Sequence, residues 1–93
     1  MIRVGDPLVD YAVALAQHLN DHHPSELRAG AARLAGLGED EILAATVTDV
    51  TQRSARLRWI DPSGAHHRTL EFNAAATDPE SLDYLLREQL AGY

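Results

Sequence analysis

The chain has 93 residues, enough for one small domain whose hydrophobic core uses most of the sequence. It contains no cysteine, which excludes disulfides, thiolate metal sites, iron–sulfur clusters and a cysteine nucleophile. With 14 acidic and 8 basic residues the formal charge is −6, the wrong sign for a protein that holds a phosphate backbone. We therefore expect no nucleic acid as a partner, and no lysine chemistry, because every basic residue is an arginine.

The N-terminus shows no targeting pattern, since an acidic residue comes at Asp6 and no long apolar run follows. The longest stretch without a charged residue, Tyr11 to Asn20, is far shorter than a bilayer span. No internal repeat and no Gly/Ser/Pro-rich linker divides the chain. We expect a single domain over residues 1–93, located in the cytoplasm and without a membrane partner.

A first helix is predicted near the N-terminus. Asp6 can cap it, and Pro7 suits the first helical position, where the missing N–H costs nothing. Apolar residues then recur at helical spacing until about Asp21. This stripe, which we expect to be buried, is Leu8, Ala12, Leu15 and Leu19.

A second helix is predicted directly after the first. Pro24 ends or kinks the first helix, because a proline pushes the residue before it, His23, towards extended geometry. Ser25 can cap the second helix, and Gly36 or Gly38 closes it. The apolar stripe of this helix is Leu27, Ala31, Leu34 and Leu37.

Three strands are predicted next. Residues 45–51 are rich in Val and Thr, and in the following segment Ala55, Leu57 and Trp59 alternate with arginines. Asp61-Pro62-Ser63-Gly64 has the composition of a type I turn, and residues 67–73 form the return strand. These segments together predict an antiparallel meander of three strands.

A closing helix completes the pattern. Thr77 or Asp78 can cap it, Pro79 lies in its first turn, and Thr77 with Glu80 has the spacing of a capping box. Its buried stripe is Leu82, Leu85, Leu86 and Leu90, with Gly92 at its end. The order of elements predicts an α+β fold, with two N-terminal helices, a three-stranded antiparallel meander and a C-terminal helix packed on one face of the sheet.

The segment from His18 to His23 is the most unusual in the chain, with three histidines among six residues. His18 and His22 are four residues apart, so their imidazoles share one helix face. Leu19 stands where a catalytic zinc motif has a glutamate, so the sequence does not support metalloprotease chemistry. Such histidines can also simply cap the C-terminal carbonyls of a helix.

The pattern His18-x-Asn20-x-x-His23 resembles the His-Met-Asn-x-Asp-His signature of a small domain found at the C-terminus of haem-utilisation split-barrel proteins of the HugZ and HutZ type. The likeness extends from Val9 to Leu90. Three further segments carry it: Ile60-Asp61-x-x-Gly64, Arg68-x-Leu70-x-Phe72 and Asp78-Pro79-Glu80-x-Leu82. The chain departs from the family at His22, where the family has Asp, and at Leu19, where it has Met. The 93 residues contain no segment that resembles the split barrel, so we expect the resemblance to carry over no flavin site.

This resemblance implies that the chain binds haem through an imidazole on the iron. The candidate cofactor-binding residues are His18, His22, His23, Asn20 and Asp21, the histidines as axial ligands and the other two as groups that orient the imidazoles. His66 and His67 are further candidates behind them. Since the sequence shows no distal pocket for oxygen activation, we expect a carrier, sensor or regulator that binds haem without turnover.

The resemblance also implies how the rest of the haem is held. Val13, Leu15 and Leu19 could cover the porphyrin face. The candidate partners of the propionates are Arg28, Arg56, Arg58 and Arg68. A domain this small cannot easily enclose haem, so we expect a shallow surface site or a site between two copies.

Two other functions remain open. The chain could be a cofactor-free interaction module whose sheet face or helical stripe docks a protein partner or a second copy. It could also bind a divalent metal through His18 and His22 with a carboxylate such as Asp21 or Glu26. An enzyme acting alone is the least expected class, because no nucleophile, base and oxyanion site can be assigned together.

Overall fold

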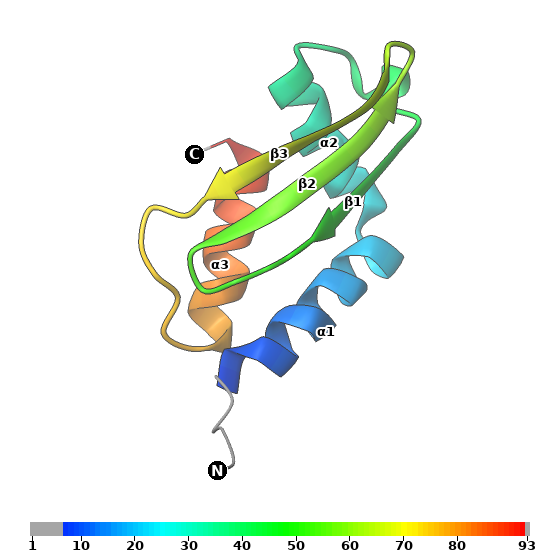
Figure 1. Ribbon diagram of the computed structural model, residues 1–93. Coiled ribbons are helices and arrows are strands. Elements are labelled where there is room, and N and C mark those ends of the chain that lie inside the picture. The colour runs from blue at the N-terminus through cyan, green and yellow to red at the C-terminus, as the bar shows by residue number, and fades with distance from the viewer. Residues whose placement is uncertain (1–6, 93) are drawn as a thin grey trace.

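The computed structural model describes residues 7–92 and has the α+β architecture that the sequence predicts (Figure 1). Asp6, the predicted first cap, lies outside the described residues. Among these residues no helix has both the length and the hydropathy that crossing a bilayer requires. The elements in chain order are α1 (Pro7–His22), α2 (Pro24–Ala35), a 3-10 turn (Glu39–Glu41), β1 (Ala44–Thr48), β2 (Ser54–Asp61), β3 (Gly64–Glu71) and α3 (Pro79–Ala91).

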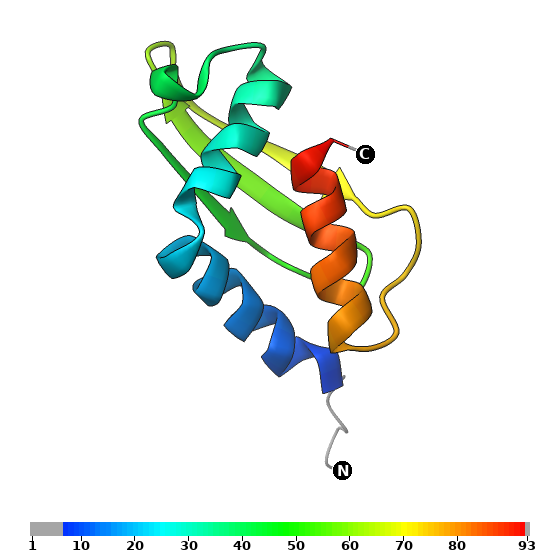
Figure 2. The same ribbon diagram turned by 180° about the vertical axis from the view of Figure 1, so that it is seen from behind.

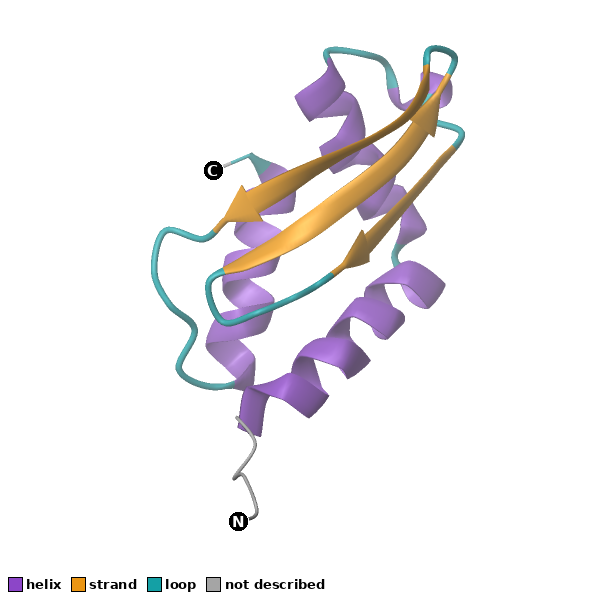
Figure 3. Cartoon of the chain, viewed as in Figure 1, coloured by secondary structure: helices purple, strands orange, loops and turns teal. Residues whose placement is uncertain are grey.

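The molecule has two layers. The strands form an antiparallel sheet in the order β1-β2-β3, and the three helices cover one face of it (Figures 2 and 3). Along the central strand β2 the buried residues Ala55, Leu57 and Trp59 alternate with exposed Arg56 and Arg58. The buried residues face the helices, so the arginines lie on the opposite, uncovered face of the sheet.

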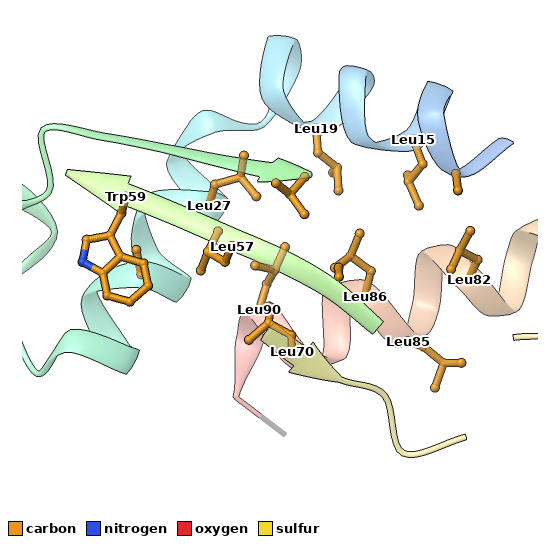
Figure 4. Close-up of a cluster of buried hydrophobic side chains, with 14 of the residues drawn as sticks. Leu15, Leu19, Leu27, Leu57, Trp59, Leu70, Leu82, Leu85, Leu86 and Leu90 are labelled. Carbon is orange, nitrogen blue, oxygen red and sulfur yellow. The ribbon is translucent and has the colours of Figure 1, made fainter. Parts of the chain in front are cut away.

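The core lies between the sheet and the helices (Figure 4). Each predicted helical stripe is buried there, except that Leu34 and Leu37 are only partly buried. Trp59 is a core residue, as predicted. The fully buried large side chains come from every layer and are Leu19, Leu27, Val47, Leu57, Leu82 and Leu86.

The boundary between α1 and α2 differs from the prediction. The N-cap of α2 is His23, with φ −129°, and Pro24 is its first residue, so Ser25 is not the cap. Pro24 takes this place because its missing N–H needs no partner in the first turn. At the other end Gly36, one of the two predicted closing residues, ends α2 with a left-handed φ of 71°.

The strand limits shift by a few residues. β1 ends at Thr48, before the predicted Thr51, because Asp49 has a positive φ of 51° that interrupts the strand. β3 covers Gly64 to Glu71 rather than residues 67–73. Its early start follows from the tight turn, since Asp61 and Gly64 already pair across the hairpin.

The start of α3 has the predicted cap but a different reciprocal partner. The Asp78 carboxylate accepts a hydrogen bond from the Ser81 N–H at 2.8 Å, and the Ser81 hydroxyl in turn accepts from the Asp78 N–H at 3.1 Å. The predicted pair of Thr77 and Glu80 is therefore wrong by one residue. Gly92 ends the helix in a left-handed conformation, as predicted.

Asn20 joins α1 to the outer edge of β1. Its Oδ1 accepts a hydrogen bond from the Val47 N–H at 2.8 Å, and its Nδ2 donates to the Val47 carbonyl at 3.0 Å. The side-chain amide thus bonds to Val47 as a neighbouring strand would. This contact fixes the C-terminal half of α1 against the sheet and closes the β1 edge at this position.

The turn between β2 and β3 is organised around the buried carboxylate of Asp61, which is 5% exposed. It accepts hydrogen bonds from the Ser63 hydroxyl at 2.6 Å, the Ser63 N–H at 2.8 Å and Trp59 Nε1 at 3.1 Å, with His66 Nε2 at 3.2 Å. The Ser63 hydroxyl contributes most to lowering the pKa of Asp61 from 3.8 to about 2; burial opposes this shift, and the two N–H donors and His66 reinforce it.

We expect Asn20→Ala to lower the free energy of unfolding by about 2 kcal/mol, because two hydrogen bonds to a partly buried strand edge are lost. Urea denaturation measures this, and the melting temperature should fall by about 10 °C. Gln17→Ala, which removes an exposed amide from the same helix, is the matched control. Equal stability of the two variants would contradict the role given to Asn20.

The second prediction concerns acid stability. Because the pKa of Asp61 is lower in the folded state, its ionised form stabilises the fold above about pH 4, and this contribution disappears as the pH falls towards about 2. The difference in free energy of unfolding between the wild type and Asp61→Asn should therefore narrow over this interval. Asp40→Asn controls for the loss of an exposed carboxylate. A difference that stays constant with pH would be inconsistent with a lowered pKa.

Candidate functional site

Three imidazoles meet where α1 ends and α2 begins. His18 and His22 are one turn apart on α1, with ring centroids separated by 5.0 Å. The His23 ring centroid lies 5.0 Å from that of His18 as well. Pro24 produces this grouping, because it ends the helical geometry at His23 and allows that ring to lie against His18.

The closest contact in the cluster is between His18 Nε2 and His23 Nε2, which are 3.2 Å apart. One of these nitrogens donates a proton and the other accepts it. An imidazole nitrogen binds a metal ion at about 2 Å, so two ligands on opposite sides of one ion would be about 4 Å apart. In the observed arrangement, the two rings cannot be opposite axial ligands of one iron.

An acidic and a basic side chain extend the cluster towards α3. Glu26 Oε2 lies 3.6 Å from His23 Nδ1, and Glu26 Oε1 lies 3.7 Å from Arg87 Nη1. Arg87 Nε also donates to Asp83 Oδ1 at 2.9 Å. The Asp83–Arg87 spacing is visible in the sequence, but sequence reasoning missed Arg87 as a site residue because only the packing of α3 on α2 brings it to Glu26.

A shallow apolar groove adjoins the cluster. It has a volume of about 310 Å³, and its lining residues are Glu26, Ala29, Arg87, Leu90 and Ala91. Glu26 contacts His23 and also lines the groove, so the groove begins beside the imidazole cluster. The volume lies at the lower end of the range for small-molecule sites, so the groove can accept only part of a large planar ligand.

The apolar residues predicted to cover a porphyrin do not lie at this surface. Leu15 and Leu19 are core residues, and Leu19 is completely buried. Val13 is exposed, but it lies about 140° around α1 from His18, on another flank of the helix. The predictions for Leu15 and Leu19 are wrong because the stripe that marks the core and the face that carries the histidines are different faces of one helix.

Asn20 and Asp21 were expected to orient the imidazoles. The described hydrogen bonds of Asn20 go to Val47 instead, about 160° around the helix from His18. Asp21 is exposed, and within residues 7–92 no hydrogen bond or ion pair joins it to a histidine. The carboxylate that does contact the cluster is Glu26.

The remaining histidines belong to the sheet. His66 stacks on Trp59, with ring centroids 5.6 Å apart, and bonds to the turn around Asp61. His67 pairs with Arg58 on the uncovered face, where Arg56 also lies. The sheet and the helical layer separate this basic stripe from the imidazole cluster.

The predicted propionate partners are therefore dispersed. Arg56 and Arg58 lie on the far face of the sheet, and Arg68 lies on β3 in register with Leu57. Arg28 lies about 160° around α2 from Glu26. Arg87 is the cationic side chain that contacts Glu26 beside the cluster.

A divalent-metal site finds no support in the described part of the chain. Across residues 7–92 no group of three or more His, Asp or Glu side chains is arranged to hold a metal ion. The predicted combination of His18 and His22 with Asp21 or Glu26 does not form such a group.

No protein-family model matches the sequence, and no curated protein matches it. Among solved structures, that of a protein described as a heme binding protein from Mycobacterium smegmatis is similar, with a TM-score of 0.71 and 23% sequence identity. The match covers 94% of this chain and 35% of that one, so this chain corresponds to a minor part of the other protein. At this identity the likeness establishes a shared fold.

Proposed function

We propose that the chain is a haem-binding accessory protein, a carrier, sensor or regulator, in which His23 is the axial iron ligand. The observation that carries this proposal is the position of His23, whose Nε2 lies in the imidazole cluster while Nδ1 lies beside the Glu26 carboxylate at 3.6 Å. Histidines that ligate metals commonly present their second ring nitrogen to a carboxylate. Such a contact favours a proton on Nδ1 and leaves the Nε2 lone pair for iron.

The other two imidazoles have supporting roles in this proposal. His18 Nε2 lies 3.2 Å from the proposed ligand atom, and this contact would be lost if His23 held iron. His22 is exposed one turn further along α1 and can contact the edge of the ligand. Asn20 supports the site indirectly, because its hydrogen bonds to Val47 hold the end of α1 in place.

The residues present fit part of a haem. Imidazole is an ordinary ligand of haem iron, the groove offers an apolar surface from Ala29, Leu90 and Ala91, and Arg87 can pair with a propionate. When bound, haem would supply an iron centre whose ligation and oxidation state can be read by a partner. The groove is too small for the whole macrocycle, which favours transient binding.

Two comparisons support the proposal. The chain shares its fold with a part of a protein described as heme binding. Its His-rich segment also resembles the signature of the domain appended to haem-utilisation proteins, in the order and spacing of several segments. The cofactor-free interaction module is the second candidate, because one face of the sheet carries no helix.

A haem titration followed by absorption spectroscopy tests the proposal. The wild type should form a saturable complex with an imidazole-ligated spectrum, and His23→Ala should weaken it by more than about tenfold. Glu26→Gln should weaken it by about tenfold, because the ligand loses its orienting carboxylate. His67→Ala, which removes an exposed imidazole from the far face of the sheet, is the matched control.

Circular dichroism should show that the His23 variant is folded, because this side chain is outside the core. Equal haem affinity of the wild type, His23→Ala and Glu26→Gln would contradict the assignment of the ligand. If the wild type bound haem no more tightly than an unrelated acidic protein does, this result would contradict haem binding itself. The interaction module would then be the working function.

A further inference from the structure

The two edge strands of the sheet, β1 and β3, differ in whether their outward backbone groups form hydrogen bonds. The Phe72 N–H donates to the Arg53 carbonyl at 2.8 Å, which marks this pair as a hydrogen-bonded pair of the β2–β3 ladder. Hydrogen-bonded pairs alternate along an antiparallel ladder, so the even-numbered residues of β3 direct their N–H and C=O groups to β2. The residues that direct them outwards are Ala65, His67, Thr69 and Glu71.

No residue in the described range 7–92 bonds to the outward groups of β3. All four of these residues are exposed, so the edge is open to solvent over most of the strand. At the other edge of the sheet, the Asn20 side chain satisfies the outward N–H and C=O of Val47. β3 therefore has the longer run of open backbone groups, at which another strand can be added.

We propose that β3 pairs antiparallel with β3 of a second copy of this chain. In the pairing we infer, Thr69 lies opposite Thr69 of the second copy, and His67 of each copy lies opposite Glu71 of the other. Threonine pairs are favourable across antiparallel strands, and an imidazole N–H of His67 can donate a hydrogen bond to the carboxylate opposite it. The result is a continuous six-stranded sheet around a two-fold axis.

The side chains disfavour two nearby registers. Pairing centred on Arg68 would set the guanidinium groups of the two copies opposite each other, and like charges in this position are destabilising. Pairing centred on His67 would set two imidazoles opposite each other and would leave Glu71 without an imidazole donor opposite it. Within the described residues Glu71 and His67 form no ion pair in the single chain, so both are available.

The proposed pairing gives a dimer and leaves no β3 edge to which a third copy could be added. A two-fold axis perpendicular to the sheet places the helices of both copies on one face, and each β3 edge is used once. The edges that remain are the two β1 strands, where Asn20 occupies the outward groups of Val47. A contact of a few backbone pairs is small, so we expect a weak dimer that forms at high protein concentration.

Sedimentation velocity of the haem-free protein, from micromolar to millimolar concentration, tests this proposal. The wild type should move from monomer to dimer. Thr69→Pro should stay monomeric, because proline removes an outward N–H and leaves the ladder to β2 intact. Thr69→Val keeps the backbone donor and is the matched control, which should still dimerise although it lacks the threonine hydroxyls.

Exchanging the side chains at positions 67 and 71 tests the register independently of any effect of proline on folding. His67→Glu sets carboxylates against each other at both ends of the pairing and should weaken dimerisation by at least about tenfold. Combining His67→Glu with Glu71→His restores an imidazole opposite each carboxylate and should restore the dimer. A wild type that stays monomeric at millimolar concentration overturns the proposal, as does a dimer that neither Thr69→Pro nor His67→Glu weakens. Because no haem is present, neither result depends on the proposed haem site.

Discussion

The arrangement of this molecule depends on one side-chain amide. Asn20 exchanges two hydrogen bonds with the Val47 backbone, and this contact sets the position of α1 along the edge of the sheet. The same contact sets the rotation of α1, since a residue that faces β1 leaves His18 and His22 on the opposite side of the helix. The imidazoles therefore face away from the sheet, next to α2 and α3, because Asn20 faces towards it.

The second constraint is the proline that follows. Pro24 allows α2 to begin immediately but excludes helical geometry at His23, so two helices meet almost without a loop. At such a junction, side chains from the last turn of one helix lie next to side chains from the first turn of the next. His18 comes from the first helix, His23 from the residue between the helices and Glu26 from the second helix. Arg87 reaches the same place from α3. The candidate site is thus made by the junction rather than by either helix alone.

Much of the fold was predictable because its signals are local. The leucine stripes of the helices, Gly36 after α2 and the turn from Asp61 to Gly64 each act within a few residues, and the structure confirms them. The end of β1 was predicted less well, because nothing in the sequence reveals that Asp49 adopts a positive φ.

The site was harder to predict, because its contacts join separate elements. Spacing alone placed His18 and His22 together, but it could not show that Asn20 bonds to a strand 27 residues away. The same applies to Arg87, whose role depends on how α3 packs. Leu15 and Leu19 were assigned both to the core and to a ligand surface, and their burial shows that the apolar periodicity reports the core.

The central claim is that haem binds at the junction of α1 and α2 through His23. Amide NMR spectra recorded while ferric haem is added to the protein test it most directly, because the paramagnetic iron broadens the signals of nearby residues. The account predicts early loss of signals around His23, Glu26 and Ala29, with those of Arg58 on the uncovered face of the sheet unchanged. Broadening centred on the sheet, or spread evenly over the surface, would contradict it.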